Sequence, residues 1–422
     1  MVIDISKTKH DPYSALRIKE FRFFVFSRFV TTVAFQMQAV IVGWQIYQMT
    51  KDAFSLGLIG LAEAIPFLSV ALFAGHIADI FNRKKLIIIS LIVFFVCSLT
   101  LLSFTFNLSG ALLLFGTTPI YIIIAMTGLA RAVIYPSQIA LMSQIVPREL
   151  YPNSSTWNST AWHIAAVTGP ALGGLIYGFS GITSAYMTVA VLIIVGLILF
   201  MGIKSKPVPV KEKKETLKQS LSTGIKFVFN NQVVLGSLSL DMFAVLFGGA
   251  VAMLPVFAAE VLHTGPQGLG FLRAMPAAGA VIMSMILAYY PPIKQAGTKL
   301  LSCVVGFGVC IILFAISKNF YLSLALLFMS GMFDNVSYVL RQMIIQLYTP
   351  DNMRGRVAAV NSIFVGSSNE IGSFESGLAA RIMGLIPSVI FGGSMTLIIV
   401  GFTTKVAPVL RKMDLRKKIK EE

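Results

Sequence analysis

Residues 75–104 read GHIADIFNRKKLIIISLIVFFVCSLTLLSF, so that a short charged segment is followed at once by a long apolar one. The part from Leu86 to Phe104 is apolar all round, unlike the alternating polarity of a strand in an outer-membrane barrel. A helix needs about 20 apolar residues to cross a bilayer. The stretch therefore predicts a transmembrane helix that begins immediately after a basic loop.

The rest of the chain repeats this pattern. Of the 422 residues, 56% are hydrophobic and 12% charged, whereas an ordinary soluble domain carries about 25% charged residues. Twelve apolar segments are separated by polar or Pro/Gly-rich breaks, and the weakest breaks lie at 107–118 and 385–388. The predicted spans are 22–49, 53–79, 85–106, 118–142, 154–178, 183–203, 233–262, 266–289, 298–316, 320–345, 355–384 and 387–408. We therefore predict an all-α membrane protein with twelve transmembrane helices.

The basic residues are distributed very unevenly over the predicted loops. Of the 34 Lys and Arg, 27 fall in the termini and the loops on the same side as the termini, two (Lys51 and Lys318) fall on the other side, and five lie within spans. Basic residues near span ends stay in the cytoplasm, so both termini are expected there. The net charge of +16 is then mainly a signal of topology. It favours contact of the basic C-terminal tail with lipid headgroups over binding of nucleic acid.

The two halves of the chain are weakly similar. A shift of 203 residues aligns identical residues over 48 ungapped positions and places span 4 on span 10 and span 5 on span 11. The identities include Gly128 with Gly331, Tyr135 with Tyr338, Pro147 with Pro350, Asn158 and Ser159 with Asn361 and Ser362, and Gly169, Gly174 and Leu175 with Gly372, Gly377 and Leu378. We predict a six-helix bundle at 1–203, a cytoplasmic linker loop at 204–232, and a second six-helix bundle with a basic tail at 233–422.

A chain of this layout, with a G-x-x-x-D loop motif and a basic cluster between spans 2 and 3, resembles the major facilitator superfamily. The matching residues are Gly75, Asp79, Arg83 and Lys84. Ile80 and Asn82 depart from the signature, which usually has a basic residue and a glycine at these positions. The stretches 254–280, 349–362 and 366–380 look like the bacterial exporter branch that includes the enterobactin exporter.

The resemblance implies the twelve-helix fold, a location in the bacterial inner membrane and a monomeric protein without a cofactor. It also implies a cytoplasmic gate, in which contacts of Asp79 between the halves stabilise the outward-open state. The corresponding second-half loop at 289–299 has no acidic residue, so we expect the device to be absent there. The alternative interpretation of the first loop is that it only fixes the topology.

Charged residues inside the spans are the candidate functional residues, because a charge at the centre of a bilayer costs about 2.5–3.5 kcal/mol unless it is paired or faces water. The candidates for the cavity and for coupling are Arg28, Glu63, Arg131, Asp241, Arg273, Asp334, Tyr338, Arg341, Glu370 and Glu375, with Gln38, Gln45 and Asn361 as polar cavity residues. Arg131 and Asp334 occupy equivalent positions in the repeat, and the hypothesis is that they face each other and exchange partners during transport. For each residue, a structural ion pair or an interhelical hydrogen bond is the competing interpretation.

These features predict a secondary active transporter that exports a small amphipathic organic molecule, such as a siderophore or a drug, by alternating access in exchange for protons. Coupling requires a buried carboxylate that exchanges with both sides, and Glu63, Asp241, Asp334 and Glu370 all satisfy the depth criterion. An importer or a metal-ion exporter on the same fold is the alternative. A membrane-embedded enzyme is a further one, although no catalytic group or metal site is predicted, because the four His residues are scattered.

Overall fold

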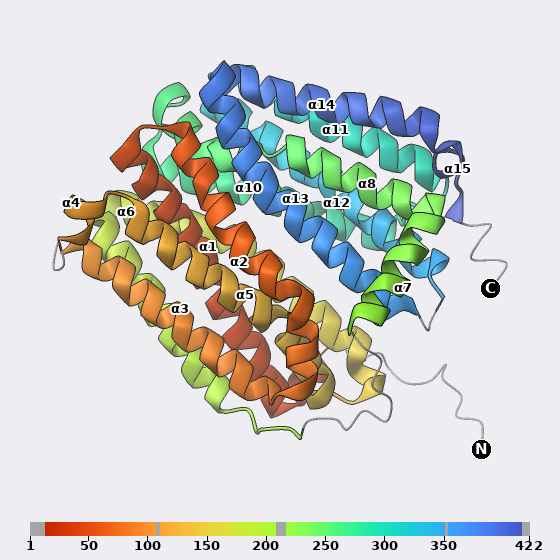
Figure 1. The fold of residues 1–422 in the computed structure, drawn as a ribbon, viewed down its shortest axis with the longest axis horizontal. Coiled ribbons are helices and arrows are strands. Elements are labelled where there is room, and N and C mark those ends of the chain that lie inside the picture. Colours follow the sequence, from red (N-terminus) through yellow and green to blue (C-terminus); the bar gives the residue numbers. More distant parts are fainter. Residues whose placement is uncertain (1–12, 107–109, 208–216, 351–352, 416–422) are drawn as a thin grey trace.

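The computed structural model describes residues 13–106, 110–207, 217–350 and 353–415, and within them the regular structure is helical. The first bundle follows a short 3₁₀ turn at Ala15–Arg17 and consists of α1 (Lys19–Thr50), α2 (Ala53–Ile80), α3 (Arg83–Thr105), the short α4 (Ala111–Phe115), α5 (Thr118–Ile145) and α6 (Tyr151–Met201). The second bundle consists of α8 (Gln232–Phe247), α9 (Leu254–Val256), α10 (Gly265–Tyr289), α11 (Ala296–Ile316), α12 (Phe320–Tyr348), α13 (Arg354–Met383), α14 (Leu385–Val406) and α15 (Pro408–Arg411). Figure 1 shows the two bundles lying side by side.

Ten helical segments of the described chain are long and apolar enough to cross a membrane. One of them, Arg148–Met201, has 54 residues and is interrupted at Gly181, where φ is 82° and ψ is 172°, so it supplies two crossings. α13 has 30 residues and is long enough to span a membrane, but it is more polar than the ten segments counted above. The twelve predicted spans are thus confirmed, with the last break at Gly384 (φ 90°) rather than at 385–388.

The seventh crossing is discontinuous. α8 ends at Phe247, and the chain continues through a 3₁₀ turn (Ala250–Met253), the single turn of α9 and a π-helical turn (Phe257–Val261). Gly248, Gly249 and Pro255 lie in this region, and such residues interrupt the regular ladder of backbone hydrogen bonds. The irregular segment lies against α1 and α10.

Part of the segment predicted as a linker loop is helical. α7 (Leu217–Asn230) packs against α13 and α8, and its Val228 is fully buried among Val234, Leu238 and Val357. Further upstream, Lys206 and Pro207 are bonded to the first bundle. Lys206 forms a 2.7 Å ion pair with Glu20 at the start of α1.

The two ends of the molecule are named here by the position of the link between the bundles. At the linker end, α6 finishes and α8 begins; the opposite end is the far end. In the half nearer the linker end each bundle has its own apolar core, built around residues such as Phe21, Leu141 and Phe200 in the first bundle and Leu300, Leu340 and Leu410 in the second.

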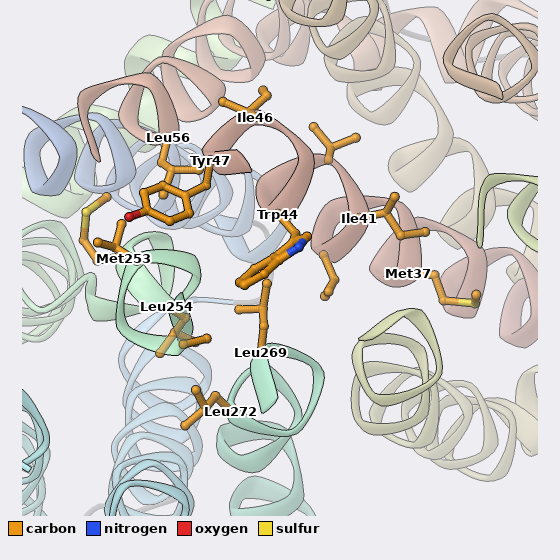
Figure 2. Packing of buried hydrophobic residues seen from close by; sticks show 14 of the residues in the cluster. Met37, Ile41, Trp44, Ile46, Tyr47, Leu56, Met253, Leu254, Leu269 and Leu272 are labelled. Atoms are coloured by element: carbon orange, nitrogen blue, oxygen red, sulfur yellow. The ribbon is translucent and has the colours of Figure 1, made fainter. Parts of the chain in front are cut away.

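The far half of the molecule has a single core shared by both bundles. Figure 2 shows Trp44 of α1 next to Leu269 of α10, and Tyr47 of α1 and Leu56 of α2 next to Met253 of the second bundle. Burial of this apolar surface stabilises contact between the bundles at the far end. The bundles are therefore joined at one end and separate at the other.

Two pairs of glycines bring the helices of the two bundles together in the far half. α2 packs along α13, and α6 packs along α10. A Cβ atom built on Gly377 of α13 would lie 2.6 Å from the Cα atom of Gly57 in α2, and one built on Gly270 of α10 would lie 3.0 Å from the Cα atom of Gly174 in α6. Backbone contacts this close are possible only because these positions lack side chains.

Candidate functional site

A cavity of about 2400 Å³ lies between the bundles. Its deep part is bounded by Gly43 of α1 and Leu56 of α2, next to the shared core, and its lining continues to Ile80, the last residue of α2, and to Arg356 in the first turn of α13. Both helix ends lie at the linker end, so the cavity is closed at the far end and open at the linker end. The charged residues along its walls are Arg28, Glu63, Arg131, Arg273, Asp334, Arg356 and Glu370.

Four of these charges form a cluster that connects the bundles. Arg131 of α5 forms an ion pair with Glu63 of α2, within the first bundle, and its Nη1 atom lies 3.9 Å from Oε1 of Glu370 on α13, in the second bundle. Arg273 of α10 is close enough to Glu370 and Arg131 to interact with both electrostatically. Two acids and two arginines thus balance one another, which reduces the cost of holding charges at this depth.

Arg28 is positioned on the first bundle by an amide rather than by an acid. Its Nη1 donates a 2.6 Å hydrogen bond to Oδ1 of Asn158 on α6. The face of α1 that carries Arg28 continues into the cavity through Phe35 to Gln38, as expected at helical spacing. The side chain of Gln38 is 8% exposed, and its Oε1 has no hydrogen-bond partner in the described structure.

Asp334 and Tyr338 of α12 lie on the wall formed by the second bundle, and both are exposed to the cavity. Among the described residues, Asp334 makes neither an ion pair nor a hydrogen bond. One turn further along α12, Arg341 is covered by α8 and forms an ion pair with Asp241, with the two side chains only 8% and 7% exposed. The predicted face of α12 therefore divides into a cavity part and a buried part.

Several predictions for individual residues require correction. Arg131 is paired with Glu63 and approaches Glu370, not Asp334. Four predicted cavity residues, Asp241, Arg341, Gln45 and Glu375, do not line the cavity. Asp241 and Arg341 form the buried pair described above, and the buried Gln45 accepts a 2.6 Å hydrogen bond from Tyr186.

Glu375 is the fourth of these residues. It is half-buried on the side of α13 that also presents the exposed Ile371 and Leu378, at the spacing of four and three residues that aligns side chains on one helix face. α2 packs on a different side of α13, through Phe374 and Gly377.

The repeat is visible in the cavity. Tyr135 and Tyr338, Asn158 and Asn361, and Arg131 and Asp334 are equivalent pairs, and all six residues line it. The equivalent glycines also have similar roles. A Cβ atom on Gly128 would lie 2.8 Å from the backbone oxygen of Glu63, so α5 lies tightly against α2, and Gly331 of α12 likewise faces the backbone of α10 at Pro276.

The basic residues Arg83 and Lys84 of the loop signature bond to carbonyl oxygens of the first bundle. Arg83 donates to the carbonyl oxygen of Ala140 at 3.3 Å, and Lys84 donates to that of Met201 at 3.1 Å. Cations are favourable at such carbonyl oxygens near helix C-termini. The surroundings of Gly75 and the side chain of Asp79 lie outside the described part of the structure, so the predicted gate contact of Asp79 stays a prediction.

Sequence reasoning did not select three residues that shape the cavity. Asn158 positions Arg28, Trp162 lines the wall at 38% exposure, and His163 lines it with Nδ1 2.8 Å from the carbonyl oxygen of Ser159. Asn158 could have been found, because the repeat pairs it with the selected Asn361. No comparable signal distinguished Trp162 or His163 from residues that pack against lipid. The described residues contain no group of three or more His, Cys, Asp or Glu arranged to hold a metal.

Two helical bundles that cross the membrane and enclose a charged cavity define a membrane transporter. The chain belongs to the Major Facilitator Superfamily, whose family profile matches residues 24–373. It is therefore a multi-pass membrane protein that transports a small-molecule substrate and is not an enzyme.

Relatives and solved structures agree with this assignment. The chain is 24% identical over 338 residues to the enterobactin exporter EntS of Shigella dysenteriae and to that of Escherichia coli O1:K1, over 80% of this chain and 79% of each relative. A POT family transporter in complex with 5-aminolevulinic acid is 9% identical, with a TM-score of 0.73 over 92% of this chain and 96% of that one. A bacterial homologue of the human lysosomal transporter Spinster, in an inward-facing and unoccupied conformation, is 14% identical, with a TM-score of 0.67 over 98% and 99%. At these identities the structural likenesses show the fold alone.

Proposed function

We propose that this transporter exports a small amphipathic organic molecule in exchange for protons, and that it works by alternating access. The observation that carries the proposal is the charged cavity, which is closed at the far end by an apolar core shared between the bundles and open at the linker end. The positive-inside rule places the linker end in the cytoplasm. The structure then corresponds to an inward-open state of the cycle.

The size and lining of the cavity support an organic substrate. Typical small-molecule sites occupy about 300–1,000 Å³, so a cavity of about 2400 Å³ accommodates a larger compound together with water. Its walls combine aromatic rings, such as Phe35, Tyr135 and Trp162, with charged groups. The enterobactin exporters among the relatives support a siderophore-like substrate and the outward direction of transport.

Asp334 is the best candidate for the proton-carrying group. An arginine partner keeps a carboxylate ionised, and in this structure Glu63 and Asp241 each have such a partner, whereas Asp334 has none among the described residues and faces the cavity. Arg131 has a different role in the proposal. It bonds Glu63 within its own bundle and approaches Glu370 across the cavity, so movement of the bundles changes the balance between these two partners.

The experiment begins with purified protein and a panel of catecholate siderophores, hydroxamate siderophores and amphipathic dyes. Compounds that raise its melting temperature are then tested for flux in proteoliposomes under an imposed pH gradient. In native protein, the imposed pH gradient should drive the selected compound in the direction opposite to the flow of protons. Asp334→Asn should bind the compound more weakly but measurably and lose the dependence of its flux on the gradient, while Glu149→Gln, an exposed loop variant, should behave as native. Flux that ignores the gradient in native protein would exclude proton coupling, and native coupling in Asp334→Asn would exclude Asp334 as the proton carrier.

A further inference from the structure

Two charges in the cavity have no counter-charge among the residues that the structure describes. The Glu63, Arg131, Arg273 and Glu370 cluster is balanced within itself, and Arg356 stands at the mouth. Arg28 on the first wall and Asp334 on the second remain. Neither forms an ion pair within the described part of the chain. Unpaired charges inside a membrane are costly and typically face water or a ligand, so these two groups mark the places where a substrate is recognised.

The surroundings of Arg28 suit an acidic aromatic group. A guanidinium has five N–H donors in a fixed fork, and the structure gives Arg28 one bond, to Asn158. The remaining donors can bind a carboxylate or a phenolate. Tyr135 and Trp162, at 36% and 38% exposure, line the same wall of the cavity, and such rings offer planar faces for stacking.

The second wall has the opposite character. Asp334 offers two acceptor oxygens without a donor from the described protein, and Tyr338, one turn away, is 48% exposed. An ammonium group would satisfy the carboxylate and lie favourably over the tyrosine ring. Deeper in the cavity, the buried Oε1 of Gln38 is a further acceptor without a partner, and a buried polar atom of this kind indicates that the bound state supplies a donor.

We propose that the cavity selects a dipolar aromatic compound, whose acidic group binds Arg28 and Asn158 and whose amine or other cationic donor binds Asp334. This inference deepens the proposed function and rests on it, because the cationic group of the substrate and a proton then compete for the same carboxylate. Binding of substrate at Asp334 expels the proton, and protonation of Asp334 expels the substrate. Such competition is what an exchange of substrate for protons requires.

The test uses three matched probes. The first is a biphenyl with a carboxylate at one para position and an aminomethyl group at the other; the second is its methyl ester, which lacks the acid; and the third is its N-acetyl derivative, which lacks the cation. Binding to the purified full-length protein in lipid nanodiscs is measured by calorimetry. Native protein should bind the dipolar probe about tenfold or more tightly than either analogue, since a hydrogen bond to a charged group contributes a factor of this size.

The variants assign each preference to one wall. Arg28→Gln should abolish the preference for the dipolar probe over the ester and keep the preference over the N-acetyl compound. Asp334→Asn should abolish the preference over the N-acetyl compound and keep the preference over the ester. Arg28→Lys, which keeps the charge, should retain part of the first preference. The exposed loop variants Arg148→Gln and Glu149→Gln are the controls, and melting curves verify that all variants are folded.

Three results would overturn the inference: equal affinity of native protein for all three probes, no binding of the dipolar probe at about 1 mM, or an equal loss of affinity for all probes in both variants. These measurements need no proton gradient. Loss of gradient-driven flux with intact probe selectivity would therefore refute the coupling and leave the binding site standing, and the reverse pattern would refute only the site.

Discussion

Replacement of Gly377 by Ala should open the far end of the transporter. A Cβ atom at this position would lie 2.6 Å from the Cα atom and 2.8 Å from the N atom of Gly57. Both of these are backbone atoms, so no flexible side chain can move aside, and α13 must shift away from α2. The extra methyl group is tolerated once the bundles separate at the far end. The substitution therefore selectively penalises the conformation described above, in which the far end is closed.

The size of the effect follows from the cost of overpacking. An extra carbon forced into a well-packed contact costs about 1–3 kcal/mol. Applied to one side of a two-state equilibrium, this changes the population ratio by roughly 5- to 150-fold. A protein that rests mainly with its far end closed should then spend a substantial fraction of time with this end open, and transport should slow because closure of the far end becomes less favourable.

Spin-label distances provide the assay, after replacement of Cys97, Cys303 and Cys310. Labels at Leu113 and Tyr321, which are 83% and 79% exposed at the far end of the two bundles, should show a longer distance in Gly377→Ala. Gly401→Ala is the matched control, because a Cβ atom at Gly401 of α14 meets nothing within 4 Å. Equal distance distributions in the two variants would show that the glycine contact does not determine closure of the far end.

Further predictions concern contacts that support the fold and the closed far end. Asp241→Asn should lower the free energy of unfolding by about 3–5 kcal/mol, because it leaves the buried Arg341 without its counter-charge. The melting temperature should fall markedly in this variant but not in Asp334→Asn, which breaks no observed contact. Equal melting temperatures of the two variants would contradict this prediction. Tyr47→Phe removes the hydrogen bond between α1 and Glu260 across the far end, a loss of about 1 kcal/mol that should raise the far-end-open population about fivefold in the same spin-label measurement. An unchanged distance distribution would show that this bond makes no net contribution to closure.

The sequence predicted the membrane crossings well because each one is a local property. A run of about 20 apolar residues identifies a span wherever it packs, and a glycine with positive φ, as at Gly181 and Gly384, ends a helix within one residue. α7 was not predicted as a helix, because its burial depends largely on contacts with α13, which lies more than 120 residues further along the chain.

The candidate site was predicted only in part, because the choice of charge partners depends on how helices are rotated and tilted. The equivalence of Arg131 and Asp334 in the repeat was correct as a statement of position, since both line the cavity. It could not show that Glu63 on the adjacent α2 lies nearer to Arg131. Similarly, helical spacing placed Arg341 beside Tyr338, but it did not show that α8 covers that part of α12.

The chain segment between α6 and α7 is attached to the first bundle at one end and to the second bundle at the other, and this limits how far the bundles can move apart. Pro207 accepts a 2.9 Å hydrogen bond from Gln144 of the first bundle, and α7, which begins at Leu217, is part of the second. Ten residue-to-residue steps between these two points reach about 35 Å at full extension. While both attachments hold, the covalent chain acts as a tether that limits how far the bundles can separate at the linker end, and it thereby limits the size of cargo that can enter there.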